Sequence, residues 1–459
     1  MIVSLLLRAL AAFSLLGGLA VGKIKLGLIG AVPLVMRLMW LDGQLLVAAL
    51  VFPTVNIALG GSTWTTPYKL LLALATLRVI WNLQRGSPLR APPIGITASY
   101  AVLLIYALLL ELTSASDPFL AVFNDGASSL VMLALMSQLV RGPSALKSML
   151  LLVNVATMLQ FAAVADELYK HGNELRCLGL SGQPNLLGIS VGMMLPISLA
   201  AALSSTERRL RLASAVAVAG GLYVIMASGS RGGMVAAVAG LGSILFLSSR
   251  SLGQFLVRVA VGVTLMIAVI PIAPKMYEVR ILSTVSDSSV DVDERSSGRV
   301  GQIDEILTLI QRQSLFGEGM GSYLDHAARA RLGRRTLPHS SFMGIAVAWG
   351  ILTALMWAIV QLSSIRASLL LRGRLGQDAW YANGLIGALL SSFLSSLSSP
   401  AYFSASLWSL VFFSHVLLQV TPRTAGPNPV SDEKVPMRRP SGPAVRWRPS
   451  EPLPTTNRY

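Results

Sequence analysis

The chain has 459 residues, of which 53% are hydrophobic and only 13% are charged. Soluble domains carry about 25% charged residues, so the composition excludes an ordinary soluble protein and indicates an all-α, polytopic membrane protein. The formal net charge is +16, but the basic residues lie between apolar runs, as membrane topology requires, which argues against a nucleic-acid partner. A single cysteine, Cys177, excludes an intrachain disulfide and a multi-cysteine metal site.

Apolar runs recur along the chain and predict about 12 transmembrane helices, within a range of about 12 to 14. The runs lie near 2–21, 24–41, 44–59, 68–84, 94–112, 119–140, 145–167, 184–203, 210–228, 232–248, 253–273, 340–362, 381–398 and 401–420. Several early runs are short for a span of about 20 residues, so some of them merge or lie re-entrant. The first run resembles a signal peptide, but no A-x-A site is obvious, which favours a first transmembrane helix.

Lysine and arginine concentrate in every second connection between the runs. These connections carry Arg85 and Arg90; Arg141 and Lys147; Arg208, Arg209 and Arg211; Arg250 and Arg258; and Arg366, Arg372 and Arg374. Basic connections mark the cytoplasmic side, so the intervening ones are predicted to face outward and both termini to be cytoplasmic. The tail at 421–459 is rich in Pro, Arg and Ser and is predicted to be disordered; its arginines either touch anionic lipid or stay solvated.

The chain therefore divides into N-terminal transmembrane helices (1–273), one large outer loop (274–338), C-terminal transmembrane helices (339–420) and the tail. The loop holds nine acids and nine Lys/Arg, so it is no simple polybasic patch. Apolar residues at helical spacing predict an amphipathic helix, which Ser296 or Ser297 can cap; they are Val300, Ile303, Ile306, Leu307 and Ile310. A turn at 317–321 and a second helix over 323–332 complete a small folded cap.

His339 follows Pro338 and opens the apolar run of 340–362. The positive end of a helix dipole disfavours the imidazolium form and leaves a neutral ring that can accept a proton near pH 7. His339 is thus a candidate general base. The alternative is a histidine that only caps the helix or lies at the membrane interface.

Two arginines are candidate anion ligands. Arg231 lies among small residues between two apolar runs, where arginine is costly and usually faces a cavity or a partner. An arginine side chain can hold a phosphate through two parallel hydrogen bonds. Arg299 opens the amphipathic helix of the loop, where the guanidinium and the helix N-terminus can act together. The alternatives are an arginine that reaches the outer headgroups for Arg231, and a plain surface arginine for Arg299.

The outer connection at 168–188 adds further polar groups, and Arg176 and Asn185 are taken from it as candidates for binding the diphosphate or the substrate; the others are Lys170, His171 and Gln183. Asn185 follows Gln183 and Pro184, and a helix cap is an equally good interpretation of it. Whether Arg176, Lys170 or Asp378 joins the site is left open by the sequence.

A D-x-D triplet at Asp291–Asp293 has the pattern that holds a metal in nucleotide-sugar glycosyltransferases. It lies on the predicted outer face, in a Ser/Asp-rich turn and away from any nucleotide-sugar supply, so no metal site is expected. The glycines at 317–321 lack the strand–turn–helix context of a nucleotide-binding loop, and no cofactor is expected.

Several short motifs, taken in order, resemble the O-antigen ligase and polymerase superfamily. They are QPNLLG (183–188), SGSRGG (228–233), SGR (297–299), LFGEGMG (315–321), PHS (338–340) and WGIL (349–352). Each motif is weak alone, and the resemblance covers roughly residues 180–365. One departure is Ser340, where many members of the superfamily have asparagine after the histidine.

The resemblance implies a multi-pass protein of the bacterial inner membrane with its active site on the periplasmic side. It implies an inverting, metal-independent transfer of O-antigen from undecaprenyl diphosphate to a sugar hydroxyl of lipid A–core, in lipopolysaccharide biosynthesis. By position, His339 resembles the catalytic base, and Arg231 and Arg299 resemble the ligands of the diphosphate or of acceptor phosphates.

Two rival functions remain open at the level of sequence. An O-antigen polymerase of the same superfamily would use the same donor, with a second lipid-linked glycan as acceptor. A transporter of lipid-linked glycans would need intramembrane charges or inverted repeats; no clear repeat is visible, although Glu111 and Asp125 lie near apolar runs.

Overall fold

The computed structural model describes residues 43, 46–47, 67–113, 118–172, 174–269, 274–277, 299–312, 315–324, 340–397 and 405–422. Within these ranges every regular element is a helix, which confirms the all-α class. The predicted runs before residue 60 lie almost wholly outside the described residues, as do most of the loop at 274–338 and the whole tail from 423 onward.

Most helices from α4 onward follow the predicted apolar runs. They are α4 (Pro67–Gln84), α5 (Ile94–Thr113), α6 (Pro118–Leu139), α7 (Ser144–His171), α8 (Pro184–Ser204), α9 (Arg208–Ser228), α10 (Arg231–Leu247), α11 (Leu252–Val269), α12 (Lys275–Tyr277), α15 (Arg299–Arg312), α17 (Ser341–Trp349), α18 (Ile351–Leu375), α19 (Ala379–Ser396) and α20 (Ala405–Val420), with 3₁₀ turns η1 (Gly179–Ser181) and η4 (Gly376–Asp378). The predicted amphipathic helix of the loop is present as α15.

Six helical stretches of the described residues are long and apolar enough to cross a membrane. The last of them, Ile351–Ser396, contains both α18 and α19, which pack against each other and are joined through η4. Four further apolar helices are shorter. The chain is therefore a multi-pass membrane protein by length and composition, and the count of about 12 spans stays a prediction.

The prediction of one continuous helix over 340–362 is wrong, because the chain breaks at Gly350. Gly350 has φ +87, a conformation that costs a residue with a side chain free energy, and α17 ends there while α18 begins. The apolar pattern runs across the break, since Trp349 and Ile351 both face packed surroundings. Periodicity alone therefore could not reveal it.

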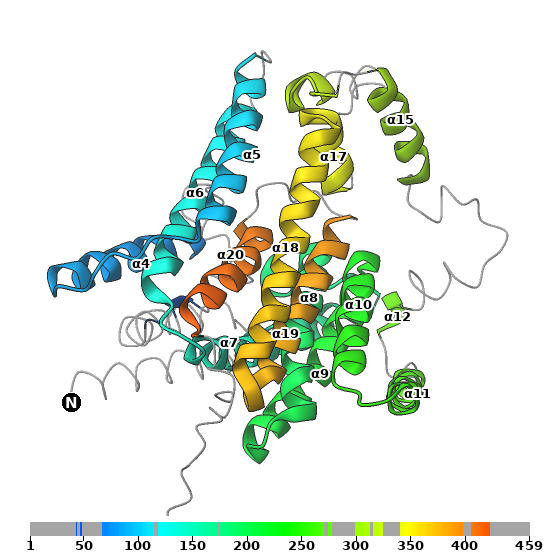
Figure 1. The fold of residues 1–459 in the computed structure, drawn as a ribbon. Helices are drawn as coiled ribbons and strands as arrows, with labels where there is room; N and C mark the ends of the chain where they lie inside the picture. The colour runs from blue at the N-terminus through cyan, green and yellow to red at the C-terminus, as the bar shows by residue number, and fades with distance from the viewer. Residues whose placement is uncertain are drawn as a thin grey trace, which may run out of the picture. The chain divides into compact units, whose positions relative to one another are not determined.

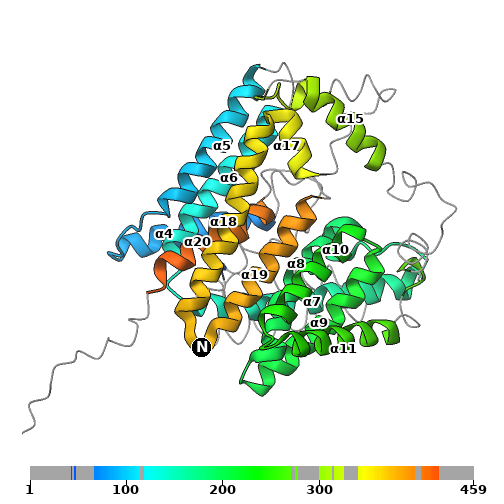
Figure 2. The same ribbon diagram turned by 45° about the vertical axis from the view of Figure 1, so that its right-hand side comes forward.

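Helix α8 lies at the centre of a group formed with α7, α9, α10 and α19, and α8, α10 and α19 lie side by side in both views (Figures 1 and 2). Buried polar groups connect the layers. Asn154 of α7 donates to the Ser214 hydroxyl of α9 (2.9 Å) and accepts from the Ser198 hydroxyl of α8 (2.8 Å). Such satisfied pairs fix which faces of apolar helices meet.

The basic connections are joined in pairs by direct contacts. Arg90 Nη1 donates to the carbonyl of Val140 (3.1 Å), and Lys147 pairs with Glu207 (3.0 Å). Three further bonds link the remaining ends: Arg372 to Leu247, Arg374 to Thr421, and Gln419 to Ala91. The connections predicted to share one side of the membrane therefore lie beside one another, and their assignment to the cytoplasm stays a prediction.

Candidate substrate-binding site

The segment between α7 and α8 folds back onto the ends of two helices and places Arg176 at their junction. The Cys177 amide donates to the carbonyl of Ala227 (3.2 Å). Arg176 Nε donates to the carbonyl of Ser228 (2.9 Å), and its Nη2 donates to Oδ1 of Asn185 (2.6 Å). The guanidinium thus joins the C-terminal end of α9, where a cation is favoured, to the first turn of α8.

The prediction that Asn185 caps α8 is wrong. The cap position is Gln183, whose side chain makes no capping bond, and Pro184 occupies the first helical position. Asn185 comes one residue later, and its exposed side chain accepts the hydrogen bond from Arg176. The cap interpretation fails because Pro184 is itself well suited to the start of a helix, and the role of Asn185 in substrate binding stays a prediction.

The turn from Ser228 to Arg231 closes the site on its second side. Gly229 reverses the chain after α9, and Ser230 caps α10 with its hydroxyl accepting from the amide of Gly233 (3.1 Å). Arg231 is the first residue of α10 and is half-buried. The residue therefore lies at the positive end of a helix, where an anion is favoured.

Close backbone contact fixes α8 against α10 at this end. A Cβ atom on Gly233 would lie 2.4 Å from the carbonyl carbon of Gly188, and one on Gly188 would lie 2.5 Å from Cβ of Ser230. Real side chains do not tolerate such distances, so both positions require glycine. This contact sets the position of Arg231 relative to Asn185.

A second group of contacts surrounds Glu111, near the C-terminal end of α5. Its carboxylate is 1% exposed, and Oε1 accepts from the amide of Met320 (2.6 Å) and from Nε1 of Trp349 (2.9 Å). One buried carboxylate therefore joins α5, the turn after α15 and the end of α17. In the sequence, Glu111 stands out only as a charge near an apolar run. A carboxylate in the last turn of an apolar helix is the feature from which this role could have been predicted.

The LFGEGMG turn docks onto the break between α17 and α18. Gly317 has φ +74, and a Cβ atom on it would lie 2.5 Å from the amide nitrogen of Gly350. The Gly319 amide donates to the carbonyl of Ala348 (2.7 Å), and the Tyr106 hydroxyl of α5 donates to the carbonyl of Phe316 (2.6 Å). The predicted turn is thus present, and its glycines serve close packing.

Arg176, Asn185 and Arg231 therefore lie where α8 and α10 begin and α9 ends. Arg299 opens α15, which packs on α17, but its side chain lies outside the described residues. His339 also lies outside them; the next residue, Ser340, caps α17 through a bond from the amide of Met343.

Of the three residues whose membership the sequence left open, Arg176 lies in this group of contacts, and Lys170 and Asp378 make other contacts or lie elsewhere. Lys170 pairs with Asp166 within α7 (2.7 Å). Asp378 lies in η4, at the start of α19. Helices α10 and α19 run antiparallel, since Ser391 contacts Ala236 while Gly387 contacts Gly240. Asp378 is therefore at the opposite end of the helices from the Arg231 turn. The Asp291–Asp293 triplet lies outside the described residues.

These features define a multi-pass helical membrane protein with polar side chains at the place where α8 and α10 begin and α9 ends. A family model described as O-antigen ligase matches residues 215–358 of the chain. The match covers under a third of the chain and supports the resemblance to the O-antigen ligase superfamily drawn from the sequence. A comparison with curated proteins found no match.

Proposed function

We propose that the protein is an O-antigen ligase. It transfers O-antigen from undecaprenyl diphosphate to a sugar hydroxyl of lipid A–core, with inversion, without a metal, and on the periplasmic side of the bacterial inner membrane. The observation that carries the proposal is the family match, which spans Arg231, Arg299 and His339. The turn at 228–231 also supports the proposal. It fixes the backbone position of Arg231, which lies inside the matched segment.

Arg231 is proposed to bind the diphosphate of the donor. The guanidinium keeps its charge at any physiological pH and presents donors in a planar fork that matches phosphate oxygens. The half-buried position at the start of α10 adds the helix dipole to that charge. Neutralising the diphosphate makes it a better leaving group, which is the main requirement when no metal takes part.

Arg176 and Asn185 are proposed to position this turn. Two nitrogens of Arg176 are directed to Ser228 and Asn185, so the side chain braces the turn that carries Arg231. The sequence makes both residues candidates for direct substrate binding, and the role that we propose for them is an indirect one. Each would act on the reaction through the geometry of the turn.

His339 is proposed to take the proton of the acceptor hydroxyl. The hydroxyl oxygen attacks the anomeric carbon from the face opposite the diphosphate, the bond from that carbon to the diphosphate oxygen breaks, and the proton passes to the imidazole. Undecaprenyl diphosphate leaves with the electron pair. The donor itself stores the driving force, so the reaction needs no ATP.

The test uses purified protein in nanodiscs with undecaprenyl-diphosphate-linked glycan, lipid A–core and a chelator. We expect a ladder of glycosylated lipid A–core from the wild type and none from His339→Ala. Arg231→Lys and Arg299→Lys should be damaged although they keep the charge, because the fork is lost. Full activity of a lysine variant would remove that arginine from the diphosphate role, and a ladder from His339→Ala would make His339 structural.

The same family segment is compatible with an O-antigen polymerase, and the assay separates the two. If no lipid A–core product forms, two lipid-linked glycans are supplied without core. A longer lipid-linked glycan would then identify a polymerase. Deletion strains give an independent answer: loss of a ligase leaves lipid A–core bare, whereas loss of a polymerase leaves one repeat attached. Glycan transport that survives His339→Ala, with no glycan product, would instead favour a transporter.

A further inference from the structure

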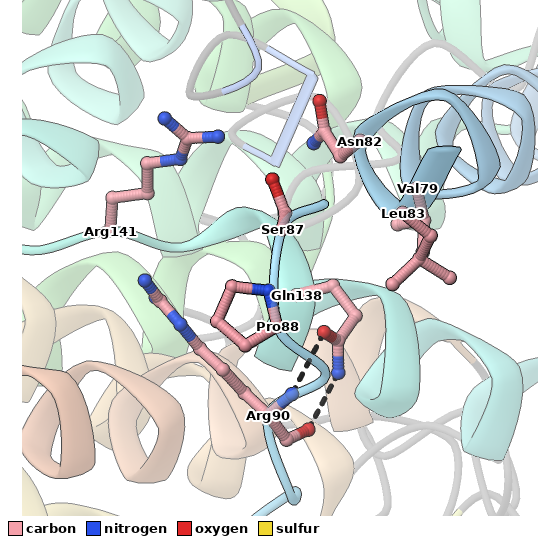
Figure 3. Close-up of a pocket in the computed structure, with 8 residues that line it drawn as sticks. All are labelled: Val79, Asn82, Leu83, Ser87, Pro88, Arg90, Gln138 and Arg141. Carbon is pink, nitrogen blue, oxygen red and sulfur yellow. Dashed lines mark hydrogen bonds between the residues drawn. The ribbon is translucent and has the colours of Figure 1, made fainter. Parts of the chain in front are cut away.

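A cavity of about 210 Å³ lies at the end of the molecule where the basic connections meet, away from the Arg231 turn. Its walls come from the last turns of α4, the connection to α5, the last turn of α6 and Arg141 (Figure 3). Polar and apolar groups share the lining. The side chains that matter for its chemistry are Arg90, Arg141, Asn82 and Ser87.

The cavity is held open by a fixed connection between α4 and α5. Gln138 of α6 binds the backbone of Arg90 in both directions: its Oε1 accepts from the Arg90 amide (3.0 Å), and its Nε2 donates to the Arg90 carbonyl (2.6 Å). Both bonds are drawn in Figure 3. The guanidinium of Arg90 is anchored by a bond to the carbonyl of Val140 (3.1 Å), so one positive charge is fixed at the rim before any ligand arrives.

The lining carries two guanidinium groups and no carboxylate. Among the described residues, neither Arg90 nor Arg141 has an ion-pair partner, whereas Lys147 on the same face pairs with Glu207. Figure 3 shows the Arg141 guanidinium on the same side as the Ser87 hydroxyl and the Asn82 amide. Two guanidinium groups that line one cavity repel each other, and an anion bound between them would offset this repulsion.

Apolar surface borders the cavity. Val79 and Leu83 form one wall, and Trp81 of the same helix is 40% exposed with Arg85 stacked over its ring at 4.6 Å. Tryptophan and arginine in this arrangement are typical of the membrane–water interface. The surroundings suit a ligand with a phosphate group and an attached acyl chain.

We propose that this cavity binds a phosphate-bearing anion, and that the source is the headgroup of an anionic phospholipid. Arg141 and the anchored Arg90 hold the phosphate oxygens, Ser87 and Asn82 donate further hydrogen bonds, and the apolar wall of α4 lies along the first part of the acyl chain. This proposal is independent of the glycosyl transfer proposed above.

The experiment measures lipid binding to the full-length protein by native mass spectrometry in detergent. Phosphatidylglycerol is compared with phosphatidylcholine and with inorganic phosphate. Arg141→Gln is the informative variant, because Arg141 is exposed and its loss leaves the core unchanged. Arg209→Gln is the matched control, since Arg209 is also exposed on the basic face but does not line the cavity; unchanged thermal unfolding of both variants verifies folding.

We expect Arg141→Gln to weaken phosphatidylglycerol binding about tenfold, because charge-assisted bonds to phosphate are the strong ones, and Arg209→Gln to leave it within about twofold. Equal affinity of wild type and Arg141→Gln, or equal losses in the two variants, would overturn the proposal. Binding of inorganic phosphate that depends on Arg141, without such binding of phosphatidylglycerol, would keep the phosphate site and overturn its lipid source.

Discussion

Removing the acceptor at Glu111 should loosen three elements at once. The carboxylate is buried and accepts hydrogen bonds from the amide of Met320 and from the Trp349 indole. In Glu111→Ala both donors lose this acceptor, and each unsatisfied buried donor costs about 1–3 kcal/mol. The expected loss in the free energy of unfolding is therefore about 2–6 kcal/mol. Glu111→Gln keeps an acceptor oxygen and loses only the assistance of the charge, which costs about 1 kcal/mol.

Thermal unfolding of the purified variants in detergent measures the size of the loss, and hydrogen–deuterium exchange locates it. Peptides covering 315–324 should exchange faster in Glu111→Ala, while peptides from α8 should not change. Leu112→Ala is the matched control, because Leu112 is the next residue and is 65% exposed. Equal losses in Glu111→Ala and Leu112→Ala would refute the reasoning. Equal losses in the Ala and Gln variants would show that the charge, and not the acceptor, holds the turn.

Three further outcomes follow from contacts described above. Gly233→Ala should cost about 1–3 kcal/mol of stability, because a Cβ atom has no room there, whereas Gly242→Ala on the same helix meets open space; equal melting temperatures would contradict the packing. Burial first, and then the Glu167 carboxylate, raises the pKa of the Cys177 thiol to about 11, so maleimide labelling of the folded protein should stay slow at neutral pH and accelerate only as the pH rises toward that value. Fast labelling at pH 7 would contradict the burial. Arg176→Lys should lower the turnover of the proposed reaction and leave donor binding less affected, and unchanged turnover would make Arg176 dispensable for the turn.

The approximate bounds of most helices could be predicted from the sequence, because a run of apolar residues long enough to cross a bilayer is a local signal. The break at Gly350 could not, since the backbone of Leu315 and Phe316, more than thirty positions earlier, fills the space that a side chain at Gly350 would need. In the same way, the backbone at Gly350 fills the space that a side chain at Gly317 would need. The residues next to Gly350 in the sequence cannot reveal a contact between such distant segments. Gly317 and Gly350 both lie in motifs that carry the family resemblance, but the motifs do not reveal that the two segments are in contact.

The candidate site also combines features that follow from local sequence with contacts that the sequence could not reveal. Arg231 was identified by its unusual position between apolar runs, which is a local signal. The bond from Arg176 to Asn185 was not, because it depends on how the segment at 172–183 folds across two helix ends. Glu111 gave the weakest signal of all: a lone carboxylate in an apolar run fits a transporter as well as a structural acceptor, and only its partners distinguish them.

The two groups of contacts share a property that bears on how the family segment works. Arg176 holds the turn at 228–231, and Glu111 holds the turn at 315–321. Both turns lie inside the matched segment of 215–358, whereas both side chains that hold them come from earlier in the chain. Functional side chains need supporting partners to keep a productive geometry. The N-terminal helices therefore supply part of that support, and a chain reduced to the matched segment would lose the fixed turns together with the contacts that form them.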